Sequence, residues 1–188
     1  MNLYNQVMLT VAKHPNPIVP ISEQQMAEVQ AVTLDYIARA QQIYKKTFLS
    51  IPILFDLRGK CAGMYRRTGR DRYIRYNPWL FAKYYQHSIE QTIPHEVAHY
   101  ITDCLWTIRR VKPHGKEWRS VMQAFGVEPK VTGDFDLSGI PVKQYQRIEY
   151  SCGCKTHQLS LIRHRRVQSG QAQYRCKDCG QRLRVISH

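Results

Sequence analysis

The sequence predicts an α+β fold in two parts: helices with a small antiparallel sheet over residues 1–145, followed by a small metal-stabilised module over residues 146–188. Three observations lead to this prediction. Apolar residues recur at helical spacing in several segments, and short runs of alternating residues lie between those segments. Four of the six cysteines form two close pairs near the C-terminus. A module of about 40 residues cannot obtain enough stability from its core alone, so we expect a metal there.

The first predicted element is a long helix that begins after Ser22. Ser22 and Gln25 have the spacing of a capping box, in which each side chain accepts a hydrogen bond from the other residue's backbone N–H. The segment that follows carries an apolar stripe at helical spacing: Met26, Val29, Ile37, Ala40, Ile43 and Tyr44. We expect this helix to act as scaffold.

Short strands are expected next. A half-buried strand is predicted by the alternation of Ile51, Ile53, Phe55 and Leu57. Residues 63–67 and 72–76 flank a four-residue turn and predict a β-hairpin in which arginines and tyrosines alternate. After the hairpin, Asn77 and Pro78 predict the N-cap and the first position of a short helix.

The most informative motif is H-E-x-x-H, formed by His95, Glu96 and His99 inside an apolar-periodic stretch. On a helix this spacing places both imidazoles on one face, one turn apart, where they can hold one Zn²⁺. Glu96 would lie beside that metal as a general base. Zinc lowers the pKa of its water to about 7, and a nearby carboxylate can then take the proton as water attacks a carbonyl.

The start of this helix has two interpretations because of Pro94. Thr92 can be the N-cap, with Pro94 in the first turn of the helix. Alternatively, the helix begins near Ser88 and is kinked at Pro94. Both interpretations keep the two histidines of the motif on one face.

A third metal ligand is expected, because catalytic zinc sites use three protein ligands and leave one position open. His114, fifteen positions after His99, lies in a turn followed by a helical apolar pattern that ends at Gly126. The pattern consists of Trp118, Val121, Met122 and Phe125. We expect His114 at or just before the start of that helix, where it meets the first helix from the side. A surface turn histidine is the alternative.

Residues 128–146 contain two prolines and two glycines with weak periodicity, and they predict a connection with little regular structure. Two cysteine pairs separated by 21 residues then predict a ribbon-type structural zinc site with four thiolates: Cys152, Cys154, Cys176 and Cys179. Because the first pair is C-x-C, His157 is an alternative to Cys152. Between the pairs, a strand is predicted by the alternation of His157, Leu159, Leu161 and Arg163. Cys61 and Cys104 have no such partners and are expected to be small buried apolar residues.

The net charge of +14 and the isoelectric point near 9.7 predict a polyanionic partner, most often nucleic acid. Residues 58–75 and 148–188 each carry a net charge of +6, or 12 of the 14 charges together. Phosphate contacts are expected from arginines in both segments: Arg66, Arg67, Arg70, Arg72, Arg163, Arg165, Arg166, Arg182 and Arg184. We expect single-stranded or junction-containing DNA to bind at least as well as duplex. A solvated basic face is the alternative.

The chain contains no apolar run of about eighteen residues, and residues 1–20 lack the features of a signal peptide. Closely spaced cysteines favour metal binding in a reducing compartment. We therefore expect a cytoplasmic protein, in which association with the nucleoid is compatible with the basic charge, and no membrane partner.

Three segments resemble the SprT-like zinc metalloprotease family: residues 94–99, residues 113–118 and the tail from Tyr150 to Leu183. The resemblance extends over essentially the whole chain. It implies a zincin-like domain over residues 1–145 and a zinc-ribbon-like module over 146–188, with one catalytic and one structural zinc. It also implies His95, His99 and His114 as zinc ligands and Glu96 as the catalytic residue.

A eukaryotic relative in this family, Spartan, is a DNA-dependent protease that digests proteins covalently trapped on DNA. The resemblance therefore implies zinc-dependent proteolysis of proteins bound or crosslinked to DNA. Two alternatives stay open: a nucleic-acid-binding regulatory protein whose metal centre is structural or idle, and a general cytosolic peptidase. DNA dependence of proteolysis distinguishes the three.

Overall fold

A computed structural model of the chain describes residues 17–106, 111–131, 133–142 and 146–186. The chain divides into two compact units, residues 1–142 and 143–188, and each unit has its own core. Among the described residues, no helix is long and apolar enough to cross a membrane.

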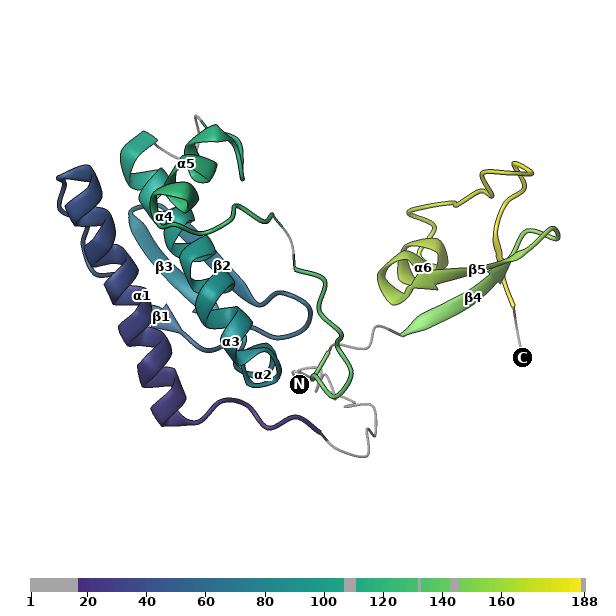
Figure 1. Cartoon of the computed structure of the whole chain (residues 1–188). Helices are drawn as coiled ribbons and strands as arrows, with labels where there is room; N and C mark the ends of the chain where they lie inside the picture. Colours follow the sequence, from purple (N-terminus) through teal and green to yellow (C-terminus); the bar gives the residue numbers. More distant parts are fainter. Residues whose placement is uncertain (1–16, 107–110, 132, 143–145, 187–188) are drawn as a thin grey trace, which may run out of the picture. The chain divides into compact units, whose positions relative to one another are not determined.

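The first unit contains a three-stranded sheet and a group of helices (Figure 1). In chain order its elements are α1 (Glu23–Tyr44), β1 (Ile53–Leu54), β2 (Gly63–Thr68), β3 (Asp71–Tyr76), α2 (Pro78–Lys83), α3 (Tyr85–His87), the π-helical turn η1 (Ser88–Thr92), α4 (Ile93–Trp106) and α5 (Lys116–Ala124). The sheet order is β1-β3-β2, with β3 antiparallel to β2 and parallel to β1. Strand β2 is therefore an edge strand. The expectation of an antiparallel sheet was wrong for β1, since the sheet is mixed.

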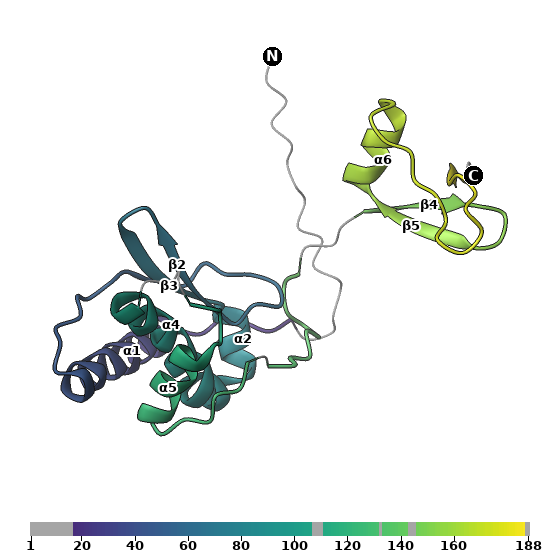
Figure 2. The same ribbon diagram turned by 90° about the horizontal axis from the view of Figure 1, so that it is seen from above.

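Helix α4 occupies the middle of the first unit. It packs against α1, α5 and β2, and Figure 2 shows the sheet on one side of it and α1 and α5 on the other. The core between these layers is formed by buried residues of all of them: Val29, Ile37, Ile74, Tyr76, Ile93, Val97, Ile101, Trp118 and Val121.

Several local predictions are confirmed. Ser22 and Gln25 form the capping box, with hydrogen bonds of 3.0 and 3.2 Å between each backbone N–H and the other side chain. The hairpin is formed by β2 and β3, and Asn77 caps α2 by accepting hydrogen bonds from two backbone N–H groups of its first turn. The connection over residues 128–146 contains no helix or strand in its described part. On α1, Ile43 departs from the expected stripe and is 43% exposed.

The strand predicted over residues 51–57 is much shorter in the structure, where only Ile53–Leu54 pairs with β3. Pro52 precedes this pair and lacks an N–H, but its carbonyl accepts a hydrogen bond of 3.0 Å from Ile74. The expected alternation of burial is kept, since Leu57 is buried and Leu54 is exposed.

Two starts were predicted for the helix that carries His95 and His99, and the structure shows the earlier one. The π-helical turn η1 begins at Ser88 and leads into α4, and the N–H of Ile93 bonds to the carbonyl of Ser88. An α-helical turn would bring the ring of Pro94 against the carbonyl four residues earlier, and the wider π turn relieves that contact.

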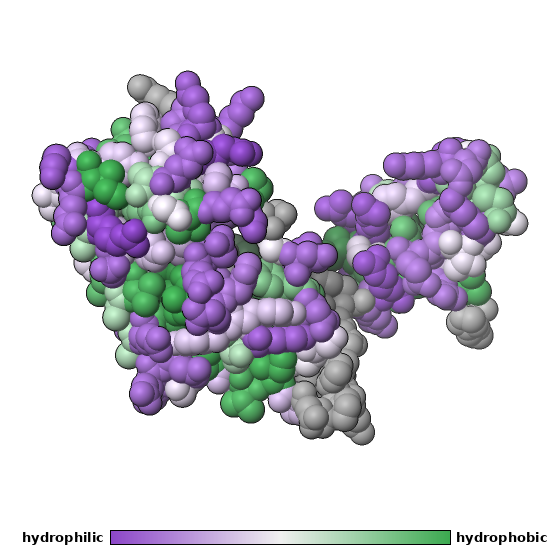
Figure 3. All heavy atoms as spheres, viewed as in Figure 1, coloured by the Kyte–Doolittle hydropathy of each residue, from purple (hydrophilic) through white to green (hydrophobic). Residues whose placement is uncertain are grey.

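The second unit is a small antiparallel sheet with one helix. Its elements are β4 (Arg147–Ser151), β5 (Thr156–Ser160), α6 (Leu161–Gln168) and β6 (Arg184–Val185), and the sheet order is β5-β4-β6. The predicted alternation through Leu161 and Arg163 was wrong beyond β5, because Ser160 accepts a hydrogen bond from the N–H of Arg163 and caps α6 instead. Hydrophilic residues cover most of the visible face of this unit (Figure 3).

Candidate functional site

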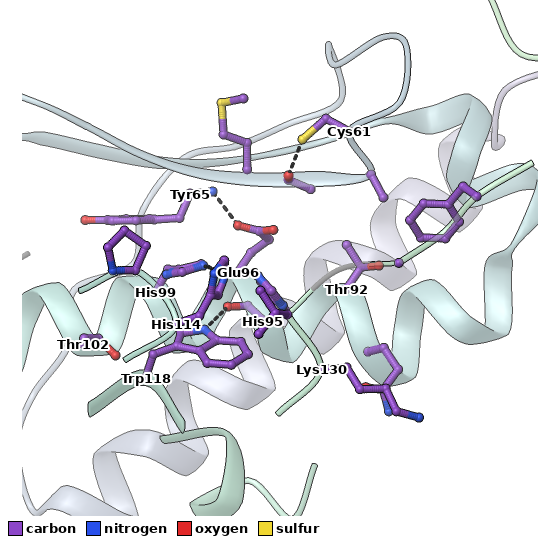
Figure 4. A pocket seen from close by; sticks show the side chains of 18 of the residues that line it. Cys61, Tyr65, Thr92, His95, Glu96, His99, Thr102, His114, Trp118 and Lys130 are labelled. Carbon is purple, nitrogen blue, oxygen red and sulfur yellow. Dashed lines mark hydrogen bonds between the residues drawn. The ribbon is translucent and has the colours of Figure 1, made fainter. Parts of the chain in front are cut away.

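Three histidines converge beside α4. His95 and His99 lie one turn apart on that helix, and His114 reaches them from the turn before α5 (Figure 4). Their Nε2 atoms are separated by 3.2 Å between His95 and His99, and by 3.0 Å between His114 and each of the other two. The structure thus brings together the three histidines that the sequence singled out.

This triangle of nitrogens fits a metal ion. Nitrogens bound to a tetrahedral zinc at ~2.0–2.1 Å lie about 3.3–3.4 Å from one another, close to the spacing observed here. Burial lowers the pKa of His95 to about 4 and that of His99 to about 3, and it also lowers the pKa of His114. All three imidazoles are therefore neutral near pH 7 and have lone pairs to offer a cation. The three histidines could hold a metal ion such as zinc.

Backbone contacts orient these rings. The imidazole of His95 is hydrogen-bonded to the backbone of Lys130, an outer contact of the kind that fixes the orientation of metal-ligating histidines. His114 has a φ of +55°, a left-handed conformation, and its carbonyl accepts a hydrogen bond of 3.2 Å from Arg119. Gly115 follows as the N-cap of α5. The turn thereby holds His114 just before the helix, as the sequence predicted.

Trp118 forms the base of the site. Its ring centroid lies 4.7 Å from those of His95 and His114 and 5.6 Å from that of His99. It is 1% exposed, and its Nε1 donates a hydrogen bond of 3.2 Å to the backbone carbonyl of His95. From the sequence, Trp118 was identified only as an apolar position of a helix.

Glu96 lies in the same cavity as the histidines. The cavity has a volume of about 510 Å³, and Glu96 is the only carboxylate among the described residues that line it. Its Oε2 accepts a hydrogen bond of 2.6 Å from the backbone N–H of Tyr65 in β2. Burial raises the pKa of Glu96 to about 8, although the hydrogen bond from Tyr65 opposes the shift. Without a bound metal ion, the carboxyl group is thus mostly protonated at neutral pH.

Gly63 permits β2 to approach Glu96. A Cβ atom at this position would lie 2.7 Å from Cγ and 2.9 Å from Oε1 of Glu96, and 2.8 Å from Cγ2 of Thr92. Any other residue would push the strand away from the helix. Sequence reasoning missed this role, and the only available signal was a glycine at the start of a predicted strand.

Asp103 was also missed by sequence reasoning. It is a buried carboxylate on α4 that accepts hydrogen bonds from Tyr65 Oη at 2.7 Å, Arg67 Nη1 at 2.9 Å and Arg72 Nε at 2.8 Å. Two of the four hairpin arginines expected to contact phosphates are therefore engaged in ion pairs with α4.

The other two hairpin arginines differ. Arg66 and Arg70 are exposed, and neither has an acidic partner within 4.0 Å in the described part of the chain. Cys61 and Cys104, expected to be buried, are half-buried, and neither joins a group of possible metal ligands among the described residues. The thiol of Cys61 donates to the carbonyl of Gly63, and Cys104 lies against the core.

In the second unit four cysteine side chains gather at one point: Cys152, Cys154, Cys176 and Cys179. The sulfur of Cys154 lies 3.0, 3.8 and 3.4 Å from those of Cys152, Cys176 and Cys179. Sulfurs around a tetrahedral zinc at ~2.3 Å are about 3.8 Å apart, so this cluster could hold a metal ion. Gly153, with a φ of +88°, allows the tight turn between the first two cysteines.

His157 lies next to this cluster. Its Nε2 is 3.3 Å from the sulfur of Cys152, and this contact raises the pKa of His157. The four sulfur atoms lie within 4.8 Å of one another and form a group without His157. The geometry therefore favours four thiolates with His157 as a hydrogen-bond donor to Cys152.

The arginines of the second unit expected to contact phosphates are all exposed: Arg163, Arg165, Arg166, Arg182 and Arg184. Arg163 lies over the ring of Tyr174, 5.6 Å from its centroid. None of the five has an acidic partner within 4.0 Å among the described residues.

Comparison with known proteins gives a consistent result. The model of the SprT-like family matches residues 33–146. The protein named Protein SprT from Vibrio parahaemolyticus is 42% identical over 158 residues, which cover 83% of this chain and 91% of that protein. Protein SprT from Pasteurella multocida is 38% identical over 153 residues (81% of this chain, 88% of that protein), and Protein SprT from Serratia proteamaculans is 35% identical over 170 residues (90% and 95%). No solved structure matches the chain.

Proposed function

The chain belongs to the SprT-like family, and from this premise we propose that it is a zinc-dependent metalloendopeptidase that acts on proteins bound or crosslinked to DNA. In this proposal the first unit is a zincin-like protease domain and the second is a basic zinc-ribbon-like module. One observation carries the catalytic part: the buried carboxylate of Glu96 lines the same cavity as three neutral histidines whose Nε2 atoms are 3.0–3.2 Å apart.

His95, His99 and His114 would hold the catalytic zinc and leave one coordination position free. When bound, zinc supplies a Lewis acid that polarises a carbonyl oxygen and makes a water easier to deprotonate. The four cysteines of the second unit would hold a zinc with a purely structural role.

Glu96 performs the proton transfers in this mechanism. Its Oε2 is fixed by the N–H of Tyr65, and its Oε1 has no hydrogen-bond partner in the described part of the chain. This free oxygen takes a proton from the attacking water and returns it to the leaving amine. A pKa near neutrality suits a group that must both accept and release a proton, and a bound cation would lower the value of about 8.

The edge of β2 offers a binding surface for an extended substrate. Gly63, Met64 and Tyr65 line the cavity, and no described strand pairs with the side of β2 opposite β3. The N–H of Tyr65 bonds to Glu96 and the carbonyl of Gly63 to Cys61, so a substrate would use the other backbone groups of this edge or displace these bonds. An extended peptide can add itself to such an edge through backbone hydrogen bonds. Recognition through the backbone would accept many sequences, which suits a protease that removes diverse proteins.

The proposed DNA partner is supported by charge. The chain has a net charge of +14, and seven of the arginines expected to contact phosphates are exposed and have no acidic partner in the described part of the chain: Arg66 and Arg70 in the hairpin, and Arg163, Arg165, Arg166, Arg182 and Arg184 in the second unit. Tyr174 beside Arg163 resembles the pairing of aromatic and basic groups that binds unpaired bases, so single-stranded or junction-containing DNA is the preferred form. Action in the cytoplasm, at the nucleoid, is part of this proposal.

Incubation of the zinc-loaded protein with a protein-DNA conjugate, with and without free DNA, tests the proposal. The expected result is cleavage of the conjugated protein and slower or no cleavage of the same protein without DNA. Equal cleavage of both substrates would instead indicate a general peptidase. DNA binding without any cleavage would indicate a regulatory protein with an idle metal centre.

A further inference from the structure

Strand β2 contacts the catalytic helix through every second residue. Gly63 lies against Glu96 and Thr92, Tyr65 bonds to Glu96, and Arg67 bonds to Asp103. Alternate residues of a strand share one face, so this entire face of β2 is applied to α4. Strand β2 therefore contacts α4 along its length.

Tyr65 makes two separate hydrogen bonds to that helix. Its backbone N–H donates to Oε2 of Glu96 at 2.6 Å, and its hydroxyl donates to Oδ2 of Asp103 at 2.7 Å. Residues seven positions apart lie on one face of a helix, about two turns from each other. Tyr65 thus spans the stretch of α4 that contains His99, and Figure 4 shows its backbone nitrogen facing Glu96 while its side chain extends away from Glu96.

Asp103 holds the hydroxyl of Tyr65 in a fixed position. Its side chain is fully buried and also forms ion pairs with two of the hairpin arginines, at 2.9 Å from Arg67 and 2.8 Å from Arg72. A buried carboxylate with such partners resists displacement, because losing them would leave an uncompensated charge. These bonds fix β2 along α4, and with it the backbone N–H that holds Glu96.

We propose that Tyr65, anchored through its hydroxyl to Asp103, is a positioning residue that holds the carboxylate of Glu96 in its working orientation. This inference rests on the proposed function where it assigns Glu96 to catalysis. The two hydrogen bonds of Tyr65, to Glu96 and to Asp103, do not depend on that function. The hydroxyl itself takes no part in the reaction.

The variant Tyr65→Phe tests the proposal with the least disturbance. It removes one oxygen atom and keeps the ring, the backbone N–H and the ion pairs of Asp103 with Arg67 and Arg72. Loss of an outer contact of this type costs about 10- to 100-fold in activity, and we expect this loss in kcat with KM changed less than about twofold and zinc content unchanged. Tyr73→Phe is the matched control, because Tyr73 pairs with Arg66 on the opposite face of the hairpin.

A double-mutant cycle tests whether Tyr65 acts through Asp103. Asp103→Asn keeps the size of the side chain and alters the anchor. If the hydroxyl works through this anchor, the losses in kcat from Tyr65→Phe and Asp103→Asn will be clearly less than additive in free energy. Fully additive losses would contradict the anchoring role.

Hydrogen exchange provides a readout that is independent of activity. The amide of residue 65 lies on the unpaired edge of β2, so we expect its protection to come from Glu96. Glu96→Ala and Tyr65→Phe should each speed its exchange by about tenfold or more, while the amide of Ile74, bonded at 3.0 Å to Pro52, stays protected. An amide at position 65 that is unprotected in the wild type, or equally protected in Tyr65→Phe, would overturn the proposal.

These measurements separate two kinds of failure. If the wild-type protein cleaves nothing but the amide of residue 65 behaves as expected, the proposed function fails and the positioning of Glu96 stands. If the wild type cleaves and Tyr65→Phe has wild-type kcat, the positioning role fails and the protease assignment stands.

Discussion

The indole nitrogen of Trp118 donates a hydrogen bond of 3.2 Å to the backbone carbonyl of His95, so α5 is bonded to the turn of α4 that carries His95. The same ring lies within 5.6 Å, centroid to centroid, of all three clustered histidines. A single buried side chain thereby sets both the spacing of the two helices and the base of the candidate metal site.

Trp118→Phe should therefore weaken metal binding as well as stability. The variant loses a buried hydrogen bond and core volume, at a cost of about 1–3 kcal/mol in the free energy of unfolding. Loss of an outer contact should also reduce zinc affinity by about 10- to 100-fold. Chemical denaturation and competitive zinc titration measure the two effects. Trp106→Phe is the control, since Trp106 is 38% exposed at the end of α4.

Metal content should show two separate sites. We expect two zinc ions per chain in protein purified without chelators, and loss of one of them in His114→Ala with folding retained. His157→Ala should keep both ions, because the four cysteines form the second group without it. Elemental analysis that finds a single zinc in the wild type would remove one site from this account.

Stability of the metal-free protein should fall in acid. The pKa values of the three histidines are lowered on folding, to about 4 for His95 and about 3 for His99. Between these values and ~6.5 the unfolded chain binds more protons, so the free energy of unfolding decreases as the pH falls through this range. Denaturation of chelator-treated protein from pH 7 to pH 4 measures the decrease. A flat profile would contradict burial of neutral imidazoles.

Glu96 should change the pH dependence of the free energy of unfolding in the opposite direction. Its pKa is raised to about 8 in the folded protein, compared with ~4.3 in the unfolded chain, so the native state binds more protons between these values. The contribution of Glu96 to the free energy of unfolding therefore decreases as the pH rises from ~4.3 through 8. The metal-free Glu96→Gln variant lacks this loss, and its stability relative to wild type should increase with pH. The same denaturation series tests this, and a difference that does not change with pH would be inconsistent with it.

The sequence predicted the parts of the site that depend on local spacing. His95, Glu96 and His99 follow from one motif, and the capping residues Ser22 and Asn77 follow from short-range patterns. Their positions depend on contacts within a few residues, which a single sequence reveals. His114 was predicted because a zinc site needs a third ligand, and the structure brings it to the other two.

The parts that were missed depend on contacts between distant segments. Asp103 is a solitary carboxylate in the sequence, and its role appears only when β2 and β3 fold onto α4. Gly63 is required by the approach of Glu96, which lies 33 positions later in the chain. The helix α6 was missed because an alternating pattern of four residues is too short to separate a strand from a strand followed by a capped helix.

DNA affinity should depend on salt in proportion to the phosphate contacts. The slope of log affinity against log salt is about −0.9 per contact for duplex and about −0.7 for single strands, so each replacement of a contacting arginine by alanine reduces it by that amount. We expect this result for Arg163, Arg165, Arg66 and Arg70. Salt-independent or undetectable binding by the intact protein would favour a general peptidase.

Arg67 and Arg72 should behave differently from the exposed arginines. Both pair with buried Asp103, so their replacement by alanine leaves that carboxylate partly uncompensated. We expect a loss in the free energy of unfolding that exceeds the loss for Arg66→Ala, the exposed neighbour on the same hairpin. Equal stability of the Arg66→Ala and Arg72→Ala proteins in denaturant would show that the ion pairs with Asp103 are not formed in solution.

The most direct test of the central claim compares the zinc-loaded wild type with the zinc-loaded Glu96→Gln variant on a protein-DNA conjugate. If Glu96 moves protons and does not hold the metal, the variant will keep its zinc content and DNA affinity and lose turnover by about two to four orders of magnitude. Cleavage at the wild-type rate by a zinc-replete Glu96→Gln protein would contradict the account.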